Sequence, residues 1–238
     1  MTQALAPIHA VEIVEVGPRD GFQPIGPFIP TTQKLAFVNG AAEAGLRRIE
    51  IGSFVSARAI PQLADTPELL KRIAAEERLL PQVLVPTFRR GVEALAAGAP
   101  MIAFVLSVSQ AHNRNNVRQS PLESADAYGE LMQATPADIP VRLNLATSMD
   151  CPFDGRVQPD DVLALLERLV PMRPDAEICL CDTTGRAAPA ASAHPARSRR
   201  CGGLRGVTVC SPPTACSPPP ARPRAAQRPA GPARPTPS

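Results

Sequence analysis

The chain has 238 residues, of which 44% are hydrophobic, 20% are charged and 3% are aromatic. These values fit one soluble domain of the size of an α/β barrel, or two small domains. All 22 acidic residues lie at or before Asp182, whereas residues 183–238 contain nine arginines and no lysine or acid. The formal net charge of +3 is therefore the sum of an acidic region and a basic tail, and we expect no single folded domain to run across the junction.

Several classes of protein are excluded by the same composition. No stretch approaches 18 consecutive apolar residues, so the sequence predicts no membrane span. Residues 1–10 lack the basic start and the apolar segment of a secretory signal. Without such a signal, the six cysteines are expected to be reduced thiols rather than a disulfide framework, and we expect a cytoplasmic location.

In chain order, the first expected element is a strand over residues 11–16, where β-branched residues alternate with polar ones up to the breaker Gly17-Pro18. Further strands are predicted at residues 48–51, 82–85, 101–108, 141–145 and 177–180. Helices are predicted at residues 31–46, 65–75 and 91–97, from Ser120 onward, and at residues 158–170. The strands begin about 33 residues apart, which is typical of βα units that build a parallel sheet.

This rhythm predicts an α/β fold of the TIM (β/α)8 barrel type that is incomplete, with about six βα units. We expect a partial barrel domain over residues 1–188 and an Arg/Pro/Ala-rich tail over residues 189–238. The tail is expected to be disordered or the product of a frameshift, because its composition cannot supply a packed core. A flavodoxin-like or Rossmann sheet is the competing fold, but no G-x-G-x-x-G follows the first strand.

Polar segments follow five of the predicted strands, at the edge where barrels place their chemistry. Asp20 could offer a hard oxygen to a divalent cation, and Arg19 could hold an anionic oxygen or a developing enolate. Glu50, on the neighbouring strand, could orient Arg19 or a metal-bound water. An Arg-Asp-Gly sequence after a strand is also typical of a simple turn, so the spacing alone leaves both interpretations open.

The residues at these strand ends resemble the motifs of the hydroxymethylglutaryl-CoA lyases, which are DRE-TIM metallolyases built on a TIM barrel. Residues 14–23 (Val-Glu-Val-Gly-Pro-Arg-Asp-Gly-Phe-Gln) are similar to the opening motif of this family. The further matching segments are residues 49–50, 53–56 (Ser-Phe-Val-Ser), 61–65 (Pro-Gln-Leu-Ala-Asp), 151–155 (Cys-Pro-Phe-Asp-Gly) and 182–185 (Asp-Thr-Thr-Gly). The resemblance covers residues 10–188.

The resemblance implies cleavage of a 3-hydroxy-3-methylglutaryl thioester into acetyl-CoA and acetoacetate, with a divalent metal, Mg²⁺ or Mn²⁺, that polarises the substrate oxygens. It assigns Asp20 as a metal ligand, Arg19 as the group that stabilises the enolate, and Glu50 as a supporting carboxylate. Asp182 would transfer protons or orient the substrate. The substrate contacts expected by this assignment are Arg19, Gln23, Ser53, Asn144 and Thr183.

The sequence also departs from the family pattern. The family takes further metal ligands from a His-x-His pair and a later Asn, and a catalytic Cys from a mobile loop, but after Asp182 the only histidine here is His194. A single carboxylate would hold Mg²⁺ or Mn²⁺ weakly, so we expect metal binding to be weak or lost and the activity of this chain to be low. The tail resembles a GC-rich gene translated in the wrong frame.

Other interpretations remain open at this point. The expected partner is an acyl-CoA substrate, with no membrane and with a homodimer in the intact family fold, while a related acyl-CoA aldolase or synthase is the alternative within enzymes. A non-catalytic remnant whose basic tail binds polyanions is the alternative outside them, although the tail has no aromatic residue for stacking on nucleic-acid bases. Cys179 and Cys181 are expected to be packed strand residues rather than metal ligands. His112 either meets a phosphate or pantetheine group or lies on a solvated loop.

Overall fold

A computed structural model describes residues 12–186 and 208–210 and shows a curled sheet of parallel strands. The strand order is β1-β2-β3-β4-β5-β8-β9, and every neighbouring pair in this sheet is parallel. The strands are β1 (Val14–Glu15), β2 (Arg48–Ser53), β3 (Leu80–Val85), β4 (Ile102–Ser107), β5 (Val141–Ala146), β8 (Glu177–Cys181) and β9 (Thr208–Cys210). The expected parallel sheet is confirmed, and its curl makes the fold a partial TIM barrel.

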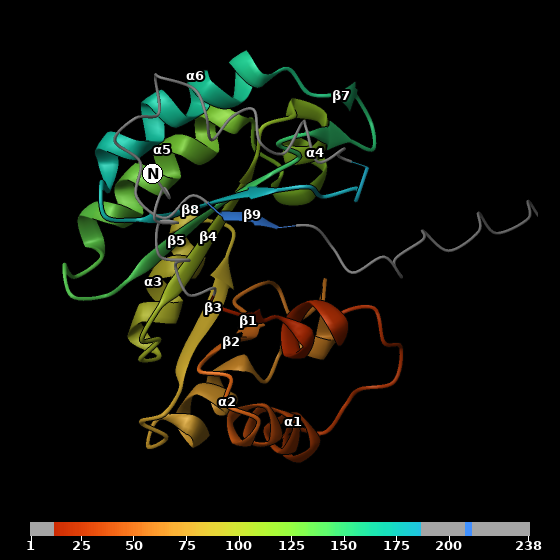
Figure 1. The fold of residues 1–238 in the computed structure, drawn as a ribbon, viewed down its shortest axis with the longest axis vertical. Helices are drawn as coiled ribbons and strands as arrows, with labels where there is room; N and C mark the ends of the chain where they lie inside the picture. The colour runs from red at the N-terminus through yellow and green to blue at the C-terminus, as the bar shows by residue number, and fades with distance from the viewer. Residues whose placement is uncertain (1–11, 187–207, 211–238) are drawn as a thin grey trace, which may run out of the picture.

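Helices cover the outer side of the curl in an arc that follows the strand order (Figure 1). They are α1 (Thr31–Glu43), α2 (Thr66–Ile73), α3 (Phe88–Ala96), α5 (Pro121–Ala134) and α6 (Pro159–Leu169), with α4 (Gln110–Val117) beyond the end of β4. Among the described residues, no helix has the length and apolarity needed to cross a membrane.

Alternation along the strands separates the two faces of the sheet. In β5, Val141, Leu143 and Leu145 join the hydrophobic core, whereas Arg142 and Asn144 lie at the intervening positions. Strand β2 repeats the pattern, with Ile49 and Ile51 in the core and polar residues between them. Because successive side chains of a strand point to opposite faces, β2 and β5 present polar side chains to the inner face of the curl, while their outer faces pack in the core.

Short-range hydrogen bonds fix where the helices begin. Ser120 and Glu123 form a reciprocal capping box at the start of α5, as residues 120–123 predict. Helix α3 begins at Phe88 rather than at residue 91, because the Thr87 side chain accepts a hydrogen bond from the Arg90 amide and caps it there. Helix α1 has no side-chain cap: Pro30 precedes it, and the Thr31 hydroxyl donates a hydrogen bond to Asp65.

One helix was not expected. Residues 110–117 form α4, so the interpretation of His112 as part of a solvated loop is wrong. The Ser109 side chain accepts a hydrogen bond from the His112 amide and caps this helix. A serine two residues after the end of a strand was the signal for it, but the polar composition of the segment concealed the helix.

The expectation of a disordered or misframed tail falls mostly outside the described residues. Within the tail the structure describes only β9, which continues the sheet in parallel register with β8. Cys181 lies opposite Cys210 in this register. The boundary proposed at residue 188 remains a prediction.

Two glycines in helices give a test of the packing. A Cβ atom on Gly91 of α3 would lie 2.3 Å from Cδ2 of Leu131, whose side chain is buried in α5, whereas a Cβ on Gly40 of α1 would meet nothing within 4 Å. We expect Gly91→Ala to lower the free energy of unfolding by about 1–3 kcal/mol through overpacking. Gly40→Ala should raise it by about 0.5–1 kcal/mol, the ordinary gain for alanine in a helix.

Urea unfolding of both variants measures this difference. Equal and positive changes would show that α3 does not pack on α5 as closely as the structure indicates.

Candidate functional site

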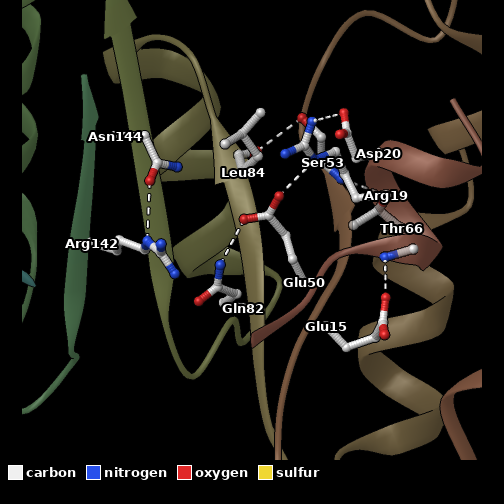
Figure 2. A network of polar contacts seen from close by, with 11 residues as sticks. Glu15, Arg19, Asp20, Glu50, Ser53, Thr66, Gln82, Leu84, Arg142 and Asn144 are labelled. Carbon is white, nitrogen blue, oxygen red and sulfur yellow. Dashed lines mark hydrogen bonds and ion pairs between the residues drawn. The ribbon is translucent and has the colours of Figure 1, made fainter. Parts of the chain in front are cut away.

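Arg19 lies at the carboxyl-terminal edge of the sheet, in a short π-helical turn (Gly17–Gly21) that directly follows β1. Its Nε donates to Oε1 of Glu50 over 2.6 Å, and its Nη1 donates to Oδ1 of Asp20 over 2.7 Å (Figure 2). The amide of Gly17 donates to the Glu15 side chain, which fixes the start of the turn. The Arg-Asp-Gly segment is thus a turn that also aims a guanidinium into the inner face.

The environment of Arg19 keeps its charge. Burial by itself would lower the pKa of this guanidinium, but the neighbouring Glu50 and Asp20 carboxylates raise it by more, so the pKa of Arg19 lies above its ordinary value. The Glu50 side chain is only 2% exposed, whereas that of Asp20 is 46% exposed. The Arg19–Glu50 ion pair therefore joins a buried carboxylate on β2 to a guanidinium at the carboxyl-terminal edge of the sheet, while Asp20 reaches solvent.

A chain of polar side chains continues from Glu50 into the inner face. Gln82 on β3 donates to the second oxygen of Glu50 over 2.6 Å (Figure 2). Its amide oxygen accepts from Nε of Arg48 over 3.2 Å. Arg48 Nη2 lies 2.5 Å from Oε2 of Glu177, and Arg142 Nη1 lies 3.6 Å from Oε1 of the same carboxylate. Three arginines (Arg19, Arg48 and Arg142) are thus paired with three carboxylates (Glu50, Glu177 and Asp20).

A cleft of about 480 Å³ opens beside Asp20, between the segment after β1 and the segment after β2. Its lining residues are Asp20, Gln23, Pro24, Ile25, Gly26, Phe28, Ala59, Ile60, Pro61 and Gln62. Gln23 is exposed there. The wall is apolar apart from Asp20 and the two glutamines, so the cleft can take a partly apolar group next to a carboxylate.

Gln62 and Lys34 hold this wall in place. The Gln62 side chain accepts from the Ile29 amide and donates to the carbonyls of Ile25 and Pro27 at 2.8–3.1 Å. The buried Lys34 ammonium donates to the Gln62 carbonyl and to Asp65, and it lies 4.4 Å from the Phe28 ring centroid. The family-like segment 61–65 thus has an observed structural role: it anchors the loop that carries Gln23.

Two further predicted contacts, Ser53 and Asn144, are buried and engaged with protein groups. The Ser53 hydroxyl donates to the Leu84 carbonyl over 3.0 Å, and its amide donates to Thr66. The Asn144 side chain accepts from Arg142 over 3.1 Å. Both residues lie on the inner face, but the structure gives each a role within the sheet.

Asp182 and Thr183 follow β8 at the same edge as Arg19. Asp182 is 2% exposed and accepts from the Arg186 amide, while the Thr183 hydroxyl accepts from the Thr147 amide over 2.8 Å. Thr147 has a φ of 55°, an unusual value for a β-branched residue, and cross-strand hydrogen bonds stabilise it. Strain of this kind is typical of functional edges.

Another cluster surrounds the ends of β4 and of the small hairpin β6 (Asp150–Cys151) and β7 (Gly155–Arg156). Ser109 donates to Asp154 over 2.6 Å and accepts from the Cys151 thiol over 3.0 Å. His112 Nδ1 lies 2.7 Å from the Ser107 hydroxyl, and burial lowers the pKa of His112 below its ordinary value. The segment 151–155 thus folds as a hairpin tied to the end of β4.

Groups able to bind a metal are sparse at this edge. Across residues 12–186, no cluster of three or more His, Cys, Asp or Glu side chains has the arrangement needed to hold a metal ion. Asp20 offers one partly exposed carboxylate, and Arg19 already occupies one of its oxygens. Cys179 is buried in β8, which agrees with its prediction as a packed strand residue.

Comparison with known proteins decides the family of this fold and site. The HMGL-like family model matches residues 10–197. The chain belongs to the HMGL-like family. It is 37% identical over 180 residues to a mouse cytoplasmic 3-hydroxy-3-methylglutaryl-CoA lyase and 35% identical over 184 residues to a Pseudomonas mevalonii hydroxymethylglutaryl-CoA lyase, covering 75% and 76% of this chain.

Solved HMG-CoA lyases share the fold. The Brucella melitensis enzyme aligns with a TM-score of 0.77 at 32% identity, over 84% of this chain and 71% of that one. The Acinetobacter baumannii enzyme, in complex with coenzyme A and 3-methylmalate, aligns with a TM-score of 0.77 at 31% identity, over 83% of this chain and 65% of that one. The chain spans about half the length of the mammalian relatives, for instance 52% of the mouse cytoplasmic lyase and 55% of the mouse mitochondrial lyase.

For this HMGL-like chain, the structure gathers some predicted residues and not others. Arg19, Asp20 and Glu50 form one connected group, and Gln23 shares the cleft with Asp20. Asp182 and Thr183 lie at the end of β8, where they accept hydrogen bonds from the Arg186 and Thr147 amides. Gln82 was missed, although a glutamine flanked by apolar strand residues, two strands from Asn144, was a usable signal for a polar inner face.

The lowered pKa of His112 predicts a pH effect on stability. The folded chain disfavours the protonated His112 imidazole, so near the ordinary histidine pKa of about 6.5 the unfolded chain binds more protons than the folded one. The free energy of unfolding therefore falls as the pH drops through that range. His112→Gln should remove this contribution. Urea unfolding between pH 5 and pH 8 measures it as the difference between the two proteins, and parallel pH profiles would contradict it.

Proposed function

We propose that this chain carries the substrate-binding part of a carbon–carbon lyase site of the hydroxymethylglutaryl-CoA lyase type. The reaction splits 3-hydroxy-3-methylglutaryl-CoA into acetyl-CoA and acetoacetate. The observation that carries the proposal is the Arg19 guanidinium, fixed between Glu50 and Asp20 beside the cleft. Relatives named for this lyase, and a relative solved with coenzyme A and 3-methylmalate, support the substrate class.

The chemistry of this step needs a cation at a defined place. When the bond between C2 and C3 of the acyl group breaks, its electron pair forms the enolate of acetyl-CoA, and the tertiary hydroxyl loses its proton as it becomes the ketone of acetoacetate. Arg19 would donate to the enolate oxygen as negative charge develops on it. No described residue accepts a hydrogen bond from Nη2 of Arg19, so this nitrogen can meet that oxygen.

The remaining roles follow from burial and position. Glu50 would hold Arg19 rather than touch substrate, because both of its oxygens are already engaged. Gln23 would contact the acyl group from the cleft wall, and Asp182 would transfer a proton or orient the substrate from the end of β8. Ser53, Asn144 and Thr183 would complete the substrate contacts along the same edge.

The divalent metal that the family resemblance implies is not matched by a complete set of ligands in the described chain. Mg²⁺ and Mn²⁺ require about six oxygen ligands, of which proteins supply at least one or two carboxylates beside waters and substrate. Asp20 supplies one carboxylate, and Arg19 occupies part of it. Asp20 would be the ligand on this chain, and the described residues do not complete the site.

A binding experiment tests the role of Arg19. Arg19→Gln should weaken the binding of 3-methylmalate in the presence of coenzyme A by about 10- to 100-fold, because it removes a charge-assisted hydrogen bond at a desolvated site. Isothermal titration calorimetry of the full chain measures the affinity.

Arg78→Gln is the matched control, since Arg78 is exposed, pairs with Glu76 and precedes β3 at the opposite edge of the sheet. Its affinity should equal that of the wild type. Equal affinity of all three proteins would remove Arg19 from the site.

An activity assay tests the metal argument. The 238-residue chain with added Mg²⁺ or Mn²⁺ should cleave 3-hydroxy-3-methylglutaryl-CoA no faster than the blank, because one carboxylate binds these ions weakly. Acetoacetate release is the measurement. Metal-dependent turnover that Asp20→Asn abolishes would instead show that the chain completes its metal site.

A further inference from the structure

We propose that Gln82 is the positioning residue of this site: it holds the Glu50 carboxylate, and through it the Arg19 guanidinium, in a single orientation. Gln82 is 1% exposed on β3, and its side chain bonds to Arg48 on one side and to Glu50 on the other. Its effect on substrate rests on the proposed function, whereas its effect on Arg19 does not.

The orientation of the Gln82 amide has only one solution. Arg48 can only donate hydrogen bonds, so the group 3.2 Å from its Nε must be the amide oxygen of Gln82. An ionised carboxylate can only accept, so the group 2.6 Å from Oε2 of Glu50 must be the amide nitrogen. The two neighbours therefore fix the amide between them, and a flipped amide would set like groups against each other at both ends.

The two oxygens of Glu50 then have separate tasks. Oε1 accepts from Arg19 at the rim, while Oε2 accepts from Gln82 inside the curl, so the carboxylate is held at both ends. Without Gln82, the buried Oε2 would lose its partner, and the carboxylate could rotate about its terminal bond to recover a donor. Such a rotation would move the acceptor of Arg19 Nε and misplace the guanidinium relative to the cleft.

Gln82 also connects Arg48 to Glu50 without adding a charge. Arg48 is itself held by Glu177, which also pairs with Arg142, so the amide is braced from the amino-terminal side of the inner face. A lysine or glutamate at position 82 would upset the balance of this buried network. The glutamine side chain carries both an acceptor oxygen and a donor nitrogen, and it is long enough to reach both neighbours. This explains a glutamine in an otherwise apolar strand.

The test uses the full chain labelled with ¹⁵N-arginine, in which Arg19→Lys identifies the Arg19 Nε–H signal. Gln82→Met keeps the length of the side chain but removes its donor. We expect the Arg19 Nε–H proton to exchange with water at least tenfold faster in this variant, and the affinity for 3-methylmalate with coenzyme A to fall about tenfold.

Asn113→Leu is the control for a merely structural loss. Asn113 of α4 is fully buried, accepts from the Ser107 amide of β4 and donates to the Ser124 hydroxyl of α5, so this variant should lower the free energy of unfolding without changing exchange at Arg19. Unchanged Arg19 exchange in Gln82→Met, or an equal rise in both variants, would overturn the proposal.

A double-mutant cycle tests the route through Glu50. In a Glu50→Gln background the carboxylate is already absent, so Gln82→Met should add less than twofold to the Arg19 exchange rate, and fully additive effects would overturn the route. The exchange measurement needs no ligand. Suppose that exchange is faster in Gln82→Met but that no protein binds the ligand. This result would support the positioning role of Gln82 and would count only against the proposed substrate.

Discussion

The buried ion pair between Arg19 and Glu50 is the interaction on which the site depends. Glu50 is 2% exposed, and an isolated carboxylate at that depth would be strongly destabilising. Arg19 neutralises it and thereby pulls the turn after β1 against β2, which fixes the position of Asp20 and one wall of the cleft. Because breaking a buried pair leaves an uncompensated charge, the turn has little freedom to move away.

The pair is the outer end of a longer polar layer inside the curl of the sheet. Amino-terminal strand positions contribute Arg48, Arg142 and Glu177, and Gln82 links this group to Glu50. Burial of so many polar groups is tolerable because each is placed opposite a partner of complementary charge or hydrogen-bonding type. A polar layer of this kind would weaken an ordinary core. Here it holds the site rigidly from the amino-terminal side of the strands, since any movement of one side chain disturbs its hydrogen-bonded neighbours.

Much of the fold was predictable, and the reasons are local. Alternating or continuous apolar runs located all six predicted strands, and the capping box at Ser120 located the start of α5. Helix α4 escaped prediction because its residues are polar and only the Ser109 cap marks it. At the site, the motif around Arg19 was found because its residues are adjacent in the sequence, whereas Gln82 was missed because it lies 32 residues from its partner Glu50.

The sequence by itself determined the parallel α/β rhythm, the strand-end motifs that mark an HMGL-like chain, and the contrast between an acidic region and a basic tail. These properties depend on residue type and on short spacings. Only the tertiary structure decided which side chains share a carboxylate, which motif residues reach the cleft and which, like Ser53, bind the backbone of a neighbouring strand instead. The physical reason is that hydrogen-bond partners are chosen by the register and curl of the sheet, which bring together residues that are far apart along the chain.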